Sequence, residues 1–130
     1  MAYNDVIKHW FEGADEAWET ANDLIVSKKY HFALFFLHLS IEKTLKGLYL
    51  EKFNEPPPYV HNLIRLAKDL DVSLTEDEIK EMEEISSFNI AARYDDYKFQ
   101  LYKRATKEFT NDWMEIGAKL REKFLEKKGK

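Results

Sequence analysis

The segment from Tyr30 to Phe53 constrains the fold more than any other, because it is apolar on nearly every side of the helix that it predicts. Its apolar side chains include Phe32, Ala33, Phe35, Phe36, Leu37, Leu39, Ile41, Leu45, Leu48, Tyr49 and Leu50. A helix with so little polar surface has to be buried on more than one side. We therefore expect this helix either to occupy the centre of a bundle or to face a second subunit as well.

A second long helix is predicted before this segment, over about residues 4–27, with Asn4 as its N-cap. Apolar residues recur there at steps of three and four, at Ile7, Trp10, Phe11, Ala14, Ala17, Trp18, Ala21, Leu24 and Ile25. That spacing forms one continuous stripe. The alanines beside Gly13 allow a neighbouring helix to approach closely. The short Lys28–Lys29 link makes the two helices antiparallel neighbours.

The rest of the chain predicts shorter helices. Three consecutive prolines, Pro56–Pro58, end the apolar helix. Thr75 and Glu78 have the spacing of a capping box. The expected elements are helices over about residues 60–70, 75–88 and 99–127, with an irregular connection over residues 89–97. No strand pattern is found. The fold class is therefore expected to be all-α, an up-and-down bundle of four to five helices, in a single domain over residues 1–130.

Composition narrows the possible functions. The chain has no cysteine, which excludes disulfides, thiolate metal sites and cysteine nucleophiles. Its net charge of −4 gives no general attraction to RNA phosphates and disfavours RNA as a ligand. Asp5, Lys8 and His9 interrupt the N-terminal stretch where a signal peptide needs apolar residues. No segment is apolar for long enough to span a membrane. We expect a cytoplasmic protein that does not bind membranes.

A polar strip interrupts the apolar helix. His38, Glu42, Lys43 and Lys46 recur at about one- and two-turn spacing. Either this strip faces solvent with a Glu42–Lys46 pair, or it lines an internal or inter-subunit polar site. His38 and Glu42 share a helix face, but two ligands are too few for a zinc site. We therefore predict no metal and no other cofactor.

Two further segments contain polar residues that could take part in binding or catalysis. His61 follows the prolines and lies four residues before Arg65, so the two share a face if that turn is helical. A histidine at a helix start can equally serve to satisfy backbone groups. Residues 91–97 join two helices, and functional groups often lie in such connections. The simpler interpretation is a surface pair between Arg93 and a neighbouring aspartate, Asp95 or Asp96.

Three segments together resemble the HEPN domain family. Members have a second helix with the pattern Tyr…Ala…Glu-Lys-x-x-Lys, a proline-containing loop that leads to His-x-Leu, and Arg-Tyr before the last helix. The matching residues are Tyr30, Ala33, Glu42, Lys43, Lys46, His61, Leu63, Arg93 and Tyr94, within segments 30–48, 57–63 and 92–94. The resemblance implies a bundle of four or five helices that is usually a homodimer. Its members are commonly encoded beside small nucleotidyltransferases, and many such pairs act as toxin–antitoxin systems.

The resemblance does not extend to the nuclease motif of the family. Many members are metal-independent RNases, whose motif is an arginine followed, after four to six residues, by a histidine. Here all four histidines precede the first arginine, Arg65, so the motif is absent and no catalytic residue is assigned. The reversed pair His61 and Arg65 provides the alternative hypothesis, an RNase toxin with a displaced active site.

What the resemblance implies by position is a polar pocket. In members without the nuclease motif, residues matching Glu42, Lys43, Lys46, His61, Arg93 and Tyr94 look like a pocket proposed to receive a nucleotide or another phosphate-bearing ligand. The two lysines and Arg93 supply positive charge, and Tyr94 can stack on a base. The family's proline after Arg-Tyr is replaced by Asp95.

Three hypotheses follow. The first is a non-catalytic, dimeric nucleotidyltransferase partner that binds a nucleotide. The second is the displaced RNase. The third is a purely structural dimeric module, in which Glu42 and Arg93 form an ion pair between helices.

Overall fold

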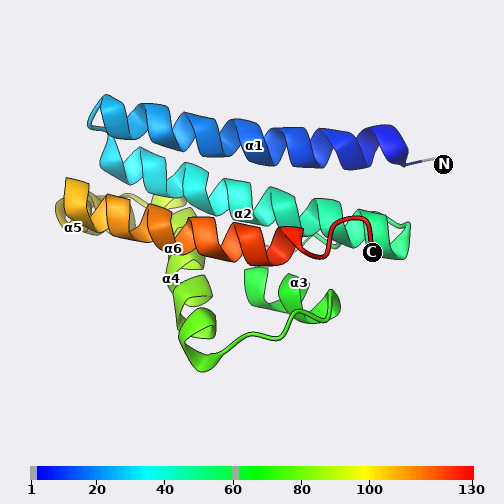
Figure 1. The fold of residues 1–130 in the computed structure, drawn as a ribbon. Coiled ribbons are helices and arrows are strands. Elements are labelled where there is room, and N and C mark those ends of the chain that lie inside the picture. The colour runs from blue at the N-terminus through cyan, green and yellow to red at the C-terminus, as the bar shows by residue number, and fades with distance from the viewer. Residues whose placement is uncertain (1–2, 60–61) are drawn as a thin grey trace.

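The computed structural model describes residues 3–59 and 62–130, and the described residues form six helices (Figure 1). These are α1 (Asn4–Val26), α2 (Tyr30–Phe53), α3 (Leu63–Asp69), α4 (Glu76–Arg93), α5 (Asp95–Arg104) and α6 (Lys107–Leu125). The all-helical bundle agrees with the prediction. The helix count does not, because four to five helices were expected. No helix among the described residues combines the length and the apolar character that crossing a membrane requires.

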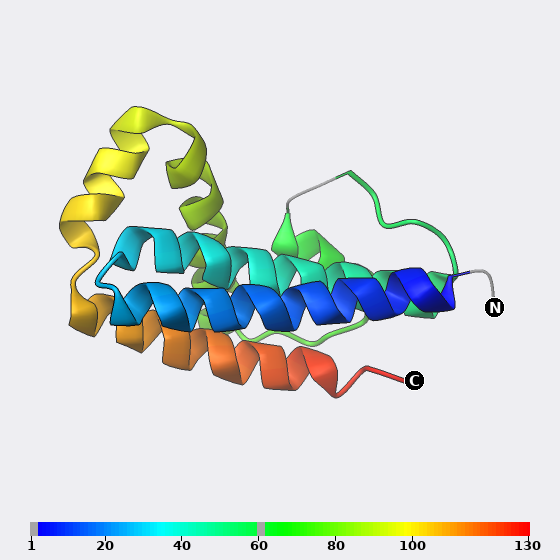
Figure 2. The same cartoon turned by 90° about the horizontal axis from the view of Figure 1, so that it is seen from above.

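Helix α2 is the central element, as its composition predicts. It contacts α1, α3, α4, α5 and α6. Figures 1 and 2 show α1, α2 and α6 side by side, with α1 antiparallel to the other two, while α4 lies across their common direction. The buried apolar residues of α2 are Ala33, Leu34, Leu37, Ile41, Leu45, Leu48 and Leu50. Because neighbours cover it on several sides, α2 needs no continuous polar face.

The α1–α2 pair is closely packed, as the small residues of α1 predict. Ala14, Ala17 and Ala21 are buried. The hydroxyl of Ser40 donates a hydrogen bond to the carbonyl oxygen of Ala14 at 2.7 Å. On the α2 side, a Cβ atom added at Gly47 would lie 3.1–3.2 Å from the side chains of α1. The prediction of Asn4 as N-cap is wrong: Tyr3 is the cap residue, and its side chain makes no capping hydrogen bond.

Polar residues define the starts of α3 and α4. The Asn62 side chain accepts a hydrogen bond from the backbone N–H of Arg65, which places the start of α3 later than the expected residue 60. The predicted capping box is confirmed at α4, where Thr75 and Glu78 bond to each other's backbone N–H groups. Lys123 of α6 donates to the Glu78 carboxylate at 2.7 Å, so the same glutamate also ties α4 to α6.

The expected helix over residues 99–127 is in fact two helices, which accounts for the wrong count. Thr106 has extended backbone angles, and its side chain accepts from the backbone N–H of Phe109, so a new helix begins there. The expected irregular connection over residues 89–97 is wrong as well. Tyr94 alone is extended between α4 and α5. Asp95 and Asp96 then occupy the first turn of α5, where negative charge complements the helix dipole.

Candidate functional site

Most of the polar strip of α2 is buried. His38, Glu42 and Lys46 are 1%, 6% and 8% exposed and Lys43 is half-buried, so of the two interpretations the solvated stripe is excluded for the first three residues. The Glu42–Lys46 pair is confirmed, with 3.4 Å between Nζ and Oε2. On the other side, Nε2 of His38 lies 3.6 Å from Oε1 of Glu42. One buried carboxylate therefore lies between a lysine and a histidine, each one helical turn away.

The two lysines of the strip lie toward α1. The Lys46 ammonium is 5.9 Å from the centre of the Trp10 ring, within cation–π range. Lys43 is less buried, and its side chain lies against Gly13. The absence of a side chain at Gly13 leaves room for this lysine. Among the predicted site residues, the structure thus brings Glu42 and Lys46 into contact and directs Lys43 along α1.

The other predicted site residues follow α2 in the sequence or lie at the end of α4. His61 lies outside the described residues. Arg93 is the last residue of α4 and Tyr94 is its C-cap; both are exposed. The Tyr94 ring packs edge-on against Tyr97, with ring centroids 6.3 Å apart. This junction offers a cation beside an exposed aromatic ring.

An exposed aromatic surface continues from this junction along α5. Tyr94, Tyr97, Phe99 and Tyr102 are each 57–62% exposed. We call these four residues the α5 aromatic surface. Lys103 lies over the Phe99 ring at 4.8 Å, and the Tyr102 ring contacts His31 of α2. Exposed aromatic side chains on a short helix offer apolar area that a partner could bury.

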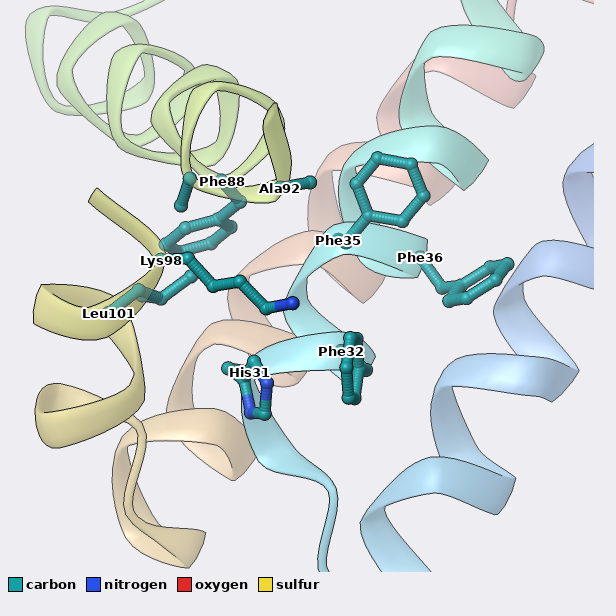
Figure 3. Close-up of a pocket in the computed structure, with 9 residues that line it drawn as sticks. His31, Phe32, Phe35, Phe36, Phe88, Ala92, Lys98 and Leu101 are labelled. Carbon is teal, nitrogen blue, oxygen red and sulfur yellow. The ribbon is translucent and has the colours of Figure 1, made fainter. Parts of the chain in front are cut away.

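A cavity of about 300 Å³ lies between α2, α4 and α5 (Figure 3). Its lining residues are His31, Phe32, Phe35, Phe36, Phe88, Ala91, Ala92, Lys98 and Leu101. Figure 3 shows Phe88 and Leu101 on α4 and α5, Phe32 beside His31 and Phe35 farther along α2, and the Lys98 side chain extending from α5 toward α2. The cavity is therefore lined mainly by aromatic side chains, with one lysine reaching across it.

The positive charge of Lys98 acts on His31, the other ionisable group of this cavity. The Lys98 ammonium lies 5.2 Å from the centre of the Phe32 ring. Burial, and to a lesser extent the charge of Lys98, lower the pKa of His31 from its ordinary value of 6.5. The lowered pKa favours the neutral imidazole of His31, and Lys98 supplies the positive charge of the cavity.

Sequence reasoning missed both the α5 aromatic surface and the cavity. The signal for the surface was present in the Tyr-rich stretch from Tyr94 to Tyr102, whose aromatic residues have no place in the stripe that begins at Ala105. The cavity had no comparable signal. It is formed where α4 and α5 meet over α2, and that meeting depends on the helix break at Tyr94.

Comparisons with known proteins agree with this architecture. The model of the HEPN domain matches residues 7–128. Among solved structures, the crystal structure of TT1696 from Thermus thermophilus superposes with a TM-score of 0.78 at 22% sequence identity, covering 93% of this chain and 97% of that one. At this level of identity the likeness concerns the fold. None of the curated proteins matches the sequence.

Proposed function

The chain belongs to the HEPN domain family, and on that premise we propose that it is a non-catalytic binding module. In this proposal it forms a homodimer, partners a nucleotidyltransferase and binds a nucleotide or a similar phosphate-bearing ligand. The observation that carries the proposal is the α5 aromatic surface beside Arg93. We assign self-association to that surface.

The α5 aromatic surface supports self-association on physical grounds. Its four rings are more than half exposed, and burying such rings against a partner releases water from a large apolar area. Tyrosine suits this role because its hydroxyl can remain solvated while its ring is covered. Lys103 lies over the Phe99 ring of this surface, so the surface can also accept a carboxylate of the partner.

Arg93 and Tyr94 support the nucleotide part of the proposal. A guanidinium binds phosphate oxygens through paired hydrogen bonds, and the exposed Tyr94 ring offers a stacking face for a base. Lys43 is the partly exposed cation of the predicted set on α2. Lys46, in contrast, is buried against Glu42 and Trp10. We therefore assign phosphate binding to Arg93 and Lys43 and a structural role to Lys46.

The order of residues in the chain supports the absence of catalysis. All four histidines precede the first arginine, so the RNase motif of the family does not occur. The reversed pair His61 and Arg65 is the alternative source of nuclease activity. Incubating the purified protein with labelled RNA tests it. Cleavage by the wild type that is lost in His61→Ala would replace the proposed function with an RNase.

A thermal-shift screen against nucleotides, with the molecular mass measured in parallel, tests the binding proposal. A nucleotide that binds the folded state raises the melting temperature, by about 2.7 kcal/mol of stability at a hundredfold excess over Kd. We expect Arg93→Ala to abolish the shift. Arg65→Ala, which removes another exposed arginine, should retain the nucleotide-induced shift. If no nucleotide shifts the melting temperature of the wild type, the proposal of nucleotide binding is contradicted. The proposal of an interaction module would then remain.

Co-expression tests the proposed partner. We expect a nucleotidyltransferase encoded beside this gene to co-elute with the wild-type chain during size-exclusion chromatography. Separate elution of the two folded proteins at micromolar concentration would contradict the partnership.

A further inference from the structure

We infer that the cavity between α2, α4 and α5 binds a small amphiphilic carboxylate, whose apolar body lies among the phenylalanine rings and whose carboxylate contacts Lys98. This site is separate from the nucleotide and partner surfaces proposed above. The inference depends on the shape of the cavity, on its apolar walls and on the position of one positive charge.

The size and the walls of the cavity fit an aromatic or aliphatic body. Its volume of about 300 Å³ is at the lower end of the range for small-molecule sites. Phe88 is almost fully buried at its inner wall, and Phe35 is partly buried on α2. Phe32 is 41% exposed near the opening. The apolar body of a ligand that entered would therefore replace water along these rings.

The positive charge of Lys98 in the cavity favours an anionic ligand. Lys98 is the cation among the described lining residues, and those residues include no carboxylate. In the described part of the chain, the contact found for the Lys98 ammonium is the Phe32 ring at 5.2 Å. A ligand carboxylate at this position would form a charge-assisted hydrogen bond, partly shielded from water. A cationic ligand would instead be repelled by Lys98.

The same lining disfavours a nucleotide here. A nucleotide brings several phosphate charges and sugar hydroxyls, and the described walls offer one ammonium and the neutral imidazole of His31 to meet them. Leaving buried polar groups without partners has a large cost. A single carboxylate on an apolar body needs one cation and leaves no such groups, which matches what the cavity provides.

A set of three isosteric probes tests the inference by NMR titration of the full-length protein. The probes are 2-naphthylacetate, the neutral 2-naphthaleneethanol and the cationic 2-naphthylethylamine. We expect the carboxylate to bind most tightly and to shift the amide signals of residues lining the cavity. Lys98→Gln should weaken carboxylate binding roughly ten- to hundredfold and leave the affinity for the neutral alcohol within about twofold.

Two further variants locate the site. Lys103→Gln removes a lysine of the same helix that lies over Phe99 and does not line the cavity, so it should leave all three affinities unchanged. Ala92→Leu adds volume at an exposed position of the wall, and should weaken the carboxylate and the alcohol alike without disturbing the core. The inference is overturned if the carboxylate does not bind, if it binds no better than the alcohol, or if Lys98→Gln or Ala92→Leu leaves its binding unchanged.

Discussion

At the scale of single residues, the buried carboxylate of Glu42 is the most consequential group. It is 6% exposed and lies between His38 and Lys46 on the same helix. Burial of a charge is costly unless partners compensate for it. The contacts of Glu42 therefore decide whether the polar strip belongs to the framework of the bundle or is available to a ligand.

Replacing Lys46 with methionine should destabilise the protein. The substitution keeps the apolar stem but removes the ammonium from Glu42, so we expect a loss of about 2–4 kcal/mol in the free energy of unfolding. Urea denaturation measures it. Lys8→Met is the matched control, because the Lys8–Glu12 pair is also four residues apart but is solvent-exposed. It should have no measurable effect. Unchanged stability in Lys46→Met would mean that the strip is not part of the framework.

Alanine substitutions at Gly117 and Gly13 should have different effects on the free energy of unfolding. At Gly117, a Cβ atom would collide with Cδ1 of Leu37, which is fully buried. Gly117→Ala should therefore cost about 1–3 kcal/mol through overpacking. At Gly13, the nearest atoms belong to the flexible Lys43 side chain. Gly13→Ala should be neutral or stabilising by up to about 1 kcal/mol, since alanine favours helix. Equal effects in urea denaturation would contradict the packing described here.

At the scale of helices, side-chain caps explain which boundaries the sequence could predict. The Thr75–Glu78 box was predicted because both partners are recognisable three residues apart. Thr106 caps α6 with its hydroxyl, but the residue three positions later, where a capping box has glutamate, is Phe109. The apolar stripe also continues across it from Ala105 to Phe109, so periodicity alone indicated one helix. A helix start marked by two recognisable capping residues can therefore be predicted from the sequence, whereas a helix break inside a continuous apolar stripe cannot.

The capping box also predicts a dependence of stability on pH. The hydrogen bond from Lys123, followed by that from the Thr75 backbone, lowers the pKa of Glu78 below its ordinary value of 4.5. As pH falls, the unfolded chain binds this proton before the folded chain does. The stabilisation is thus complete above pH 4.5 and is lost as pH falls through the lower folded-state pKa.

Glu78→Gln should remove this contribution, at a cost of about 1–2 kcal/mol near neutral pH. The difference from wild type should shrink as pH falls from about 6 to about 3, measured by urea denaturation at each pH. Glu76→Gln alters an exposed glutamate of the same turn and should show a smaller difference near neutral pH. A Glu78→Gln difference that is constant over this range would contradict the assignment.

At the scale of the whole molecule, burial was easier to predict than the arrangement of surfaces. The central place of α2 follows from its apolar circumference, and its antiparallel pairing with α1 follows from the short link around Lys28 and Lys29. The α5 aromatic surface and the cavity behind it depend on how α4 and α5 meet over α2. That geometry is set by the single extended residue Tyr94, and no periodic pattern encodes it. The predicted pocket was likewise assembled only in part, with Glu42 and Lys46 in contact and His61 outside the described residues.

The central proposal is that this chain associates through its α5 aromatic surface. Sedimentation velocity of the wild type, Tyr97→Ser/Phe99→Ser and the control Tyr59→Ser tests it most directly. Tyr59 is a fully exposed aromatic residue in the loop after α2, and the three substituted side chains are all more than half exposed, so the fold should persist. We predict twice the 15.5 kDa mass of one chain for the wild type and for Tyr59→Ser, and a single-chain mass for the double variant. A single-chain mass for the wild type at micromolar concentration, or a double variant that remains dimeric, would contradict the claim.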